Sequence, residues 1–118
     1  MEVKSGRLKH SILTALADKE MVSILDCCMF QSKSVADIIR EKNIPHTTAY
    51  RKIKSMLDEG LLVVESIQIT PDGKKFSLIK STFRTITVKY EHNEMAVEAE
   101  ENVDVVKKIA EKLFSLSS

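Results

Sequence analysis

Residues 34–60 read SVADIIREKNIPHTTAYRKIKSMLDEG and carry the pattern of two helices joined by a tight turn. Ser34 is followed three residues later by Asp37, a spacing close to a capping box, so a first helix is expected to begin there. The residue before a proline avoids the helical region, and proline suits the first turn of a helix. The chain is therefore expected to break at Pro45 and to start a second helix. Gly60 is a natural left-handed end for that helix.

The second predicted helix, over about residues 46–59, has one apolar face and one basic face. Its apolar residues recur every three or four positions and would face inward; they are Ala49, Ile53, Met56 and Leu57. From Lys42 to Ser55 the segment has four basic residues and no acidic one. A basic helix behind a tight turn is the geometry that inserts into the major groove of DNA, so DNA binding is predicted. The alternative is a helical hairpin whose basic face is only solvated.

After Gly60 the hydrophobic pattern changes from helical spacing to alternation. Residues 70–73 read TPDG, with proline and glycine at the places that a tight turn favours, so a β-hairpin is expected. Lys74 and Lys75 follow this turn and would meet a phosphate backbone beside the basic helix, with 70–75 as the contacting tip. An ordinary solvated hairpin tip is the alternative for either lysine.

The candidate DNA contacts divide by role. His46 begins the second helix and would face a base or a phosphate. The residues expected to reach base edges are Thr47, Thr48, Tyr50 and Arg51, of which Arg51 suits a guanine. The residues expected to hold phosphates are Lys52, Lys54, Lys74 and Lys75.

The string Ile-Pro-x-x-Thr-x-Tyr-Arg-x-Ile-Lys-x-x-x-x-x-Gly-Leu-Leu, from Ile44 to Leu62, resembles the winged helix-turn-helix of ArsR, MarR and IclR regulators of bacteria and archaea. The resemblance extends over about residues 18–79. It implies an α+β fold with a three-helix core and a β-hairpin wing, and it implies a sequence-specific transcriptional regulator that binds double-stranded DNA. It also implies a homodimer, because such regulators usually bind palindromic sites.

The chain is expected to be a single domain over residues 1–118, since its length allows one core. An N-terminal helix is predicted over 5–17, a winged core over 18–80, a second hairpin over 81–101 and a C-terminal helix over 102–118. The second hairpin has a competing interpretation, in which the last helix starts at Asn93. Extra hairpins of this kind occur in archaeal-looking relatives, and the resemblance favours the strands.

The C-terminal helix predicted over 102–118 has a wide apolar stripe and needs a surface to cover it. That surface is either the chain's own domain or a second subunit, and the second subunit is favoured. The three-helix core is expected to include Ile24, Ile38, Ile44, Ala49 and Ile53.

Charge is distributed unevenly along the chain. Residues 1–90 carry 15 Lys+Arg against 10 Asp+Glu, whereas residues 91–118 carry 3 against 7. This asymmetry suggests a basic binding face followed by an acidic segment that points elsewhere. The first twenty residues contain no long uncharged apolar run, so we expect a cytoplasmic protein without a membrane span.

Few residues suggest other chemistry. Cys27 and Cys28 are adjacent, so a mutual disulfide is not expected; Cys28 fits the core, and Cys27 is either packed or redox-sensitive. The three histidines, His10, His46 and His92, form no metal-ligand spacing, so no metal is expected. The sequence has no phosphate-cradling glycine loop, no Gly-x-Ser-x-Gly motif and no paired carboxylates in an evident pocket setting, so no cofactor and no enzyme activity are expected. An effector ligand is not identified by the sequence. The alternative function is a winged helix that binds protein partners in a larger complex without contacting DNA.

Overall fold

A computed structural model of the chain describes residues 1–102, 110–111 and 113–114. Within residues 1–102 the fold is α+β, with four helices and two antiparallel hairpins, an arrangement compatible with a winged helix. The helices are α1 (Gly6–Leu16), α2 (Lys19–Cys27), α3 (Val35–Lys42) and α4 (His46–Asp58). The strands are β1 (Leu62–Ile69), β2 (Lys75–Ser81), β3 (Phe83–Glu91) and β4 (Glu94–Glu101). The C-terminal helix predicted over 102–118 lies almost entirely outside the described residues.

Local signals in the sequence begin and end the central helices. The Ser34 hydroxyl accepts a hydrogen bond from the Asp37 backbone at 3.1 Å, and the Asp37 carboxylate accepts one from the Ser34 backbone at 3.4 Å. This capping box starts α3. Asn43 ends α3 in the left-handed region, Pro45 precedes α4, and Gly60 follows α4 with a φ of 81°. The predicted pair of helices and the turn between them are confirmed.

Each hairpin contains one bulge. β1 pairs with β2 and β3 pairs with β4, and the register shifts between Val64 and Ser66 in the first hairpin and between Phe83 and Thr85 in the second. A single bridge joins Lys33 to Ile79, so the segment before α3 runs beside β2.

The predicted second hairpin is confirmed, and the competing helix from Asn93 is wrong. His92 and Asn93 have φ values of 51° and 61°, and Glu91 pairs with Glu94 on either side of them. Two central residues with positive φ form the tight turn that matches the twist of paired strands. Asparagine tolerates this conformation better than most residues, which outweighs the helix preference of the alanines and glutamates after it.

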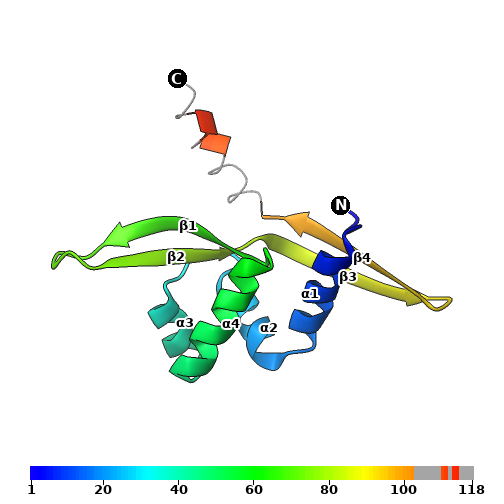
Figure 1. Ribbon diagram of the computed structural model, residues 1–118, viewed down its shortest axis with the longest axis horizontal. Helices are drawn as coiled ribbons and strands as arrows, with labels where there is room; N and C mark the ends of the chain where they lie inside the picture. Colours follow the sequence, from blue (N-terminus) through cyan, green and yellow to red (C-terminus); the bar gives the residue numbers. More distant parts are fainter. Residues whose placement is uncertain (103–109, 112, 115–118) are drawn as a thin grey trace.

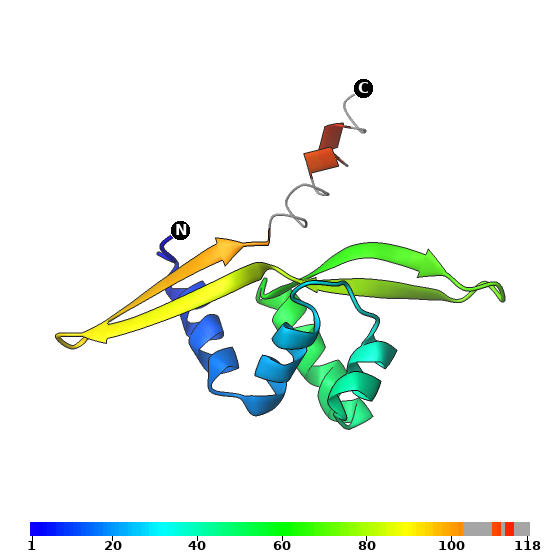
Figure 2. The ribbon, with the colours of Figure 1, turned by 180° about the vertical axis from the view of Figure 1, so that it is seen from behind.

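The two hairpins extend in opposite directions, and the four helices lie on one side of them (Figure 1). The view from behind shows the same two layers, with α1 beside the second hairpin, α3 and α4 beside the first hairpin, and α2 between α1 and α4 (Figure 2). The longest dimension is 57 Å. The molecule is therefore divided into a half built on α3, α4, β1 and β2, and a half built on α1, β3 and β4.

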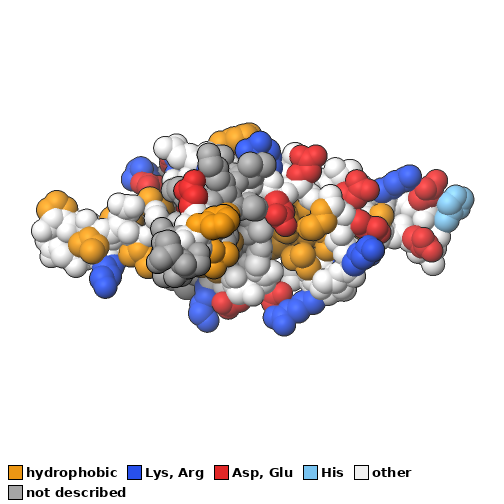
Figure 3. Space-filling view, turned by 90° about the horizontal axis from the view of Figure 1, so that it is seen from above, with side chains coloured by type: hydrophobic (Ala, Val, Ile, Leu, Met, Phe, Trp, Pro, Cys, Tyr) orange, Lys and Arg blue, Asp and Glu red, His pale blue; other side chains and the backbone are white. Residues whose placement is uncertain are grey.

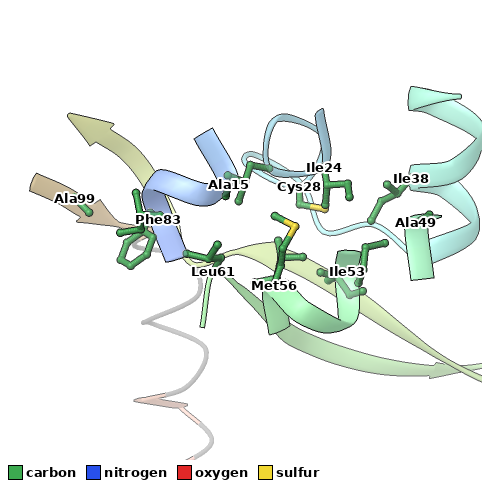
Figure 4. Packing of buried hydrophobic residues seen from close by; sticks show 14 of the residues in the cluster. Ala15, Ile24, Cys28, Ile38, Ala49, Ile53, Met56, Leu61, Phe83 and Ala99 are labelled. Carbon is green, nitrogen blue, oxygen red and sulfur yellow. The ribbon is translucent and has the colours of Figure 1, made fainter. Parts of the chain in front are cut away.

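A continuous core joins the two halves (Figure 4). All five residues predicted for the three-helix core are buried; they are Ile24, Ile38, Ile44, Ala49 and Ile53. Cys28 is fully buried among them, as predicted. Phe83, Val97 and Ala99 extend the core into the second hairpin, so that hairpin is packed against the domain at its base.

Candidate nucleic-acid interface

The outward face of α4 is exposed, as its hydrophobic spacing requires. Ala49, Ile53 and Met56 are buried, which fixes the rotation of the helix about its axis. Thr48 is half-buried. The predicted contact residues on α4 that are exposed are His46, Thr47, Tyr50, Arg51 and Lys54.

The first turn of α4 has no side-chain cap. Pro45 stands at the N-cap position and makes no side-chain hydrogen bond, and the first turn contains no acidic residue. The first backbone N–H groups of a helix have no partner within the helix, and the helix dipole adds positive potential there. His46 and Thr47 lie at this end and are exposed. The N-terminus of α4 is thus suited to an anion such as a phosphate.

A groove of about 560 Å³ separates α4 from the first hairpin. Of the predicted contact residues, it brings together Tyr50 from α4 and Lys75 from β2. Its other lining residues come from the start of α3 and from β2; they are Ser34, Val35, Ala36, Phe76 and Ser77. A recognition helix and a wing on either side of one groove can hold a DNA backbone between them.

Ser34 and Ser77 also line the groove, and neither is among the contact residues predicted from the sequence. Ser77 lies two positions from Lys75 on β2, so the two side chains share a face of the strand. The alternation of side chains along a predicted strand is therefore a signal that places Ser77 beside Lys75. Ser34 reaches the groove because the segment before α3 pairs with β2 at Lys33 and Ile79. No local pattern in the sequence predicts that pairing.

Lys52 is not available to DNA, which corrects the prediction that it holds a phosphate. Its side chain is 10% exposed, and its Nζ lies 2.6 Å from an Asp18 carboxylate oxygen and 3.1 Å from one of Glu20. Hydrogen bonding to Asp18 raises the pKa of Lys52, and the same hydrogen bond, helped by the Met21 backbone N–H, lowers the pKa of Asp18. Lys52 therefore ties α4 to the start of α2.

The other basic residues of this face remain open to solvent. Lys54 is 81% exposed and 4.0 Å from Asp58, a weak surface contact. Arg51, Lys74 and Lys75 are exposed, and no ion pair engages them within the part of the chain that the structure describes. The hairpin tip beside Lys74 is held by hydrogen bonds between Thr70 and Lys74 and by the Gly73 turn.

Acidic side chains gather on the opposite half of the molecule. Viewed from the side away from the helices, most of the acidic groups lie over β3 and β4 and toward the tip that carries His92 (Figure 3). The uneven charge of the sequence therefore becomes an uneven charge in space. An anionic polymer would be repelled by the surface over β3 and β4.

Cys27 lacks the features of a reactive thiol. Its Sγ donates a hydrogen bond to the Glu41 carboxylate at 3.1 Å. Burial first, and then the Glu41 hydrogen bond and charge, raise the pKa of Cys27 to about 11. A redox-sensing thiol needs a lowered pKa, so the packing role is favoured.

No group of three or more metal-ligating side chains occurs among the described residues, and no helix among them could cross a membrane. The chain matches no protein-family model and no curated protein. The functional assignment therefore rests on the sequence resemblance and on the geometry of the α4 face and its groove.

Proposed function

We propose that this protein is a winged helix-turn-helix regulator that binds double-stranded DNA in a sequence-specific manner. In this proposal α4 enters the major groove and the hairpin of β1 and β2 is the wing. The observation that carries the proposal is the groove between α4 and the wing, which Tyr50 and Lys75 both line. The exposed face of α4 carries no acidic residue from His46 to Ser55, and its N-terminus is uncapped; both features support the same role.

The side chains of this face differ in the part of the DNA that they contact. Thr47, Tyr50 and Arg51 reach base edges, and each good pair contributes about 1–3 kcal/mol of discrimination. Lys54, Lys74 and Lys75 neutralise phosphates and add affinity for any sequence. Lys52 has no part in DNA contact, because its ammonium group is held by Asp18 and Glu20.

A bound sequence selected from a random duplex pool allows these roles to be separated. Arg51→Ala should lower affinity for the selected site and leave affinity for random duplex nearly unchanged. Lys74→Ala should weaken both and reduce the slope of log K against log salt by about one unit. Lys89→Ala is the matched control, since Lys89 is an exposed lysine on the other hairpin. Identical effects of Arg51→Ala and Lys74→Ala would contradict the division of roles.

A second candidate function is protein binding by the wing. Ile67 and Ile69 are 63% and 65% exposed on β1. Contact with phosphates does not require exposed apolar side chains, whereas a protein interface uses them. A winged helix used in this way would form a stable complex with another protein and would show no salt-dependent affinity for DNA. Ile67→Thr with Ile69→Thr would then abolish partner binding, whereas the DNA-binding proposal predicts a small effect on DNA affinity.

A further inference from the structure

A second groove lies in the other half of the molecule, between the helices α1 and α2 and the start of β3. Its volume is about 230 Å³. Two charged residues, Asp26 and Arg84, reach it. The rest of its wall is mainly apolar and includes Leu16, Val22, Leu25, Met29, Phe83 and Ile86.

The bulge in β3 places Arg84 in this groove. Phe83 pairs with Glu101 and Thr85 pairs with Glu100, so Arg84 is the extra residue without a partner across the ladder. A bulge bends its strand and changes the direction of a side chain. The Arg84 Nε is buried and has no hydrogen-bond partner in the described structure, and no ion pair engages its guanidinium there.

The other charges near the two bulges are compensated. The bulge of β1 carries Glu65, whose carboxylate lies 4.0 Å from the Lys80 ammonium. Asp26, the acidic residue of the groove, is 2.8 Å from Lys42 Nζ. A buried donor without a partner destabilises a fold, so an acceptor placed beside the guanidinium of Arg84 would be favourable.

We propose that this groove binds a small carboxylic acid with an apolar body, whose carboxylate pairs with Arg84. The planar guanidinium matches a carboxylate with two parallel hydrogen bonds, and the apolar wall covers the rest of the ligand. The groove is smaller than the roughly 300–1,000 Å³ of most drug-sized sites, so the ligand has the size of benzoate or hexanoate. The site is separate from the α4 face and does not depend on DNA binding.

Titration of the full chain with sodium benzoate and sodium hexanoate tests the proposal. The Met29 methyl group lies in the groove wall and reports binding by its NMR chemical shift. We expect saturable shifts with at least one acid, and about tenfold weaker binding of benzamide and hexanamide, which have the same shape without the charge. Absence of saturable binding, including the case in which another part of the chain fills the groove, would contradict the proposal.

Three variants separate charge from shape. Arg84→Gln should weaken carboxylate binding about tenfold or more, because the charged hydrogen bonds are lost. Arg40→Gln is the matched control, since Arg40 is an exposed arginine on α3, and it should leave the affinity unchanged. Val22→Trp fills the mouth of the groove at a position that is 40% exposed, so it should abolish binding in a folded protein. Equal affinity of wild type and Arg84→Gln for benzoate would overturn the assignment.

Discussion

At the scale of single residues, a charge has different roles on this molecule according to what lies beside it. Lys52 and Lys54 are two positions apart on α4, yet one is held by two carboxylates and the other is 81% exposed. Helical spacing alone placed Lys52 at the flank of the basic face. Its partners are 34 and 32 residues away in sequence, so only the packing of α2 against α4 shows the ion pairs.

The Lys52 cluster makes a prediction about stability and pH. Lys52→Met should lower the free energy of unfolding by about 1 kcal/mol, since both carboxylates remain partly solvated. The folded pKa of Asp18 lies below its ordinary value of 3.8, so the contribution is complete above that pH and is lost as pH falls below it. Urea titrations between pH 7 and pH 3 should therefore show the two proteins converging in acid.

Lys54→Met is the control for this experiment, because its exposed side chain should change stability little. In DNA-binding assays Lys54→Met should have the larger effect of the two variants. Lys54→Met should reduce the salt slope, whereas Lys52→Met should leave it unchanged. A reduced slope for Lys52→Met would restore Lys52 as a phosphate contact.

Cys27 yields a second prediction at this scale. Iodoacetamide should modify it slowly at pH 8, and the rate should continue to rise toward pH 11, because the thiolate forms only near the raised pKa of about 11. Glu41→Gln should increase the rate at pH 8 by removing the carboxylate that accepts the thiol proton. Tandem mass spectrometry distinguishes Cys27 from the buried Cys28. Fast modification of the native wild-type protein at pH 8 would show that Cys27 is a reactive thiol.

At the scale of elements, local signals predicted most of the fold. The cap at Ser34, the break at Pro45 and the stop at Gly60 act within one turn of chain, so the sequence alone locates α3 and α4 well. Bulges are different, because they depend on how a strand meets the helices beneath it. The groove at Arg84 could not be predicted for that reason. The contribution of Ser34 to the groove beside α4 could not be predicted either, because it depends on the long-range pairing of Lys33 with Ile79.

The tight turn between β3 and β4 decides whether that region is a hairpin. Asn93→Val should lower the free energy of unfolding by about 1–2 kcal/mol, because a β-branched residue is strained at a positive φ. Asn93→Gly should stabilise the protein or leave it unchanged. Thermal unfolding of both variants measures the difference. A helix beginning at Asn93 would give the opposite order, with glycine as the more damaging change.

At the scale of the whole molecule, two hairpins point away from one layer of helices and carry different charge. The basic α4 face belongs to the half that contains the first hairpin (Figure 1), and on the surface away from the helices most acidic side chains lie over β3 and β4 (Figure 3). Two copies related by a two-fold axis would present two α4 helices to successive major grooves, as a palindromic site requires. We propose such a homodimer as part of the regulator function.

Leu113 offers a test of the dimer, because its side chain is 63% exposed in the single chain. Leu113→Glu should convert a dimer to a monomer, since a buried charge without a partner is costly in an interface. Light scattering after size-exclusion chromatography reports the mass directly. Lys89→Glu, a change to glutamate on the second hairpin, serves as the control and should remain dimeric. A wild-type protein that is monomeric at all concentrations would exclude the dimer.

The central claim is that the α4 face and the wing bind duplex DNA through its phosphates and bases. Its most direct test is fluorescence anisotropy of the wild-type protein with labelled, sheared genomic duplex at increasing salt. The account predicts binding at about 50 mM salt, with log K falling linearly as log salt rises. With three or more phosphate contacts, the slope should be about −3 or steeper. Lys74→Ala should make that slope shallower, and Lys89→Ala should not. No binding at low salt, or an affinity that does not change with salt, would contradict the account.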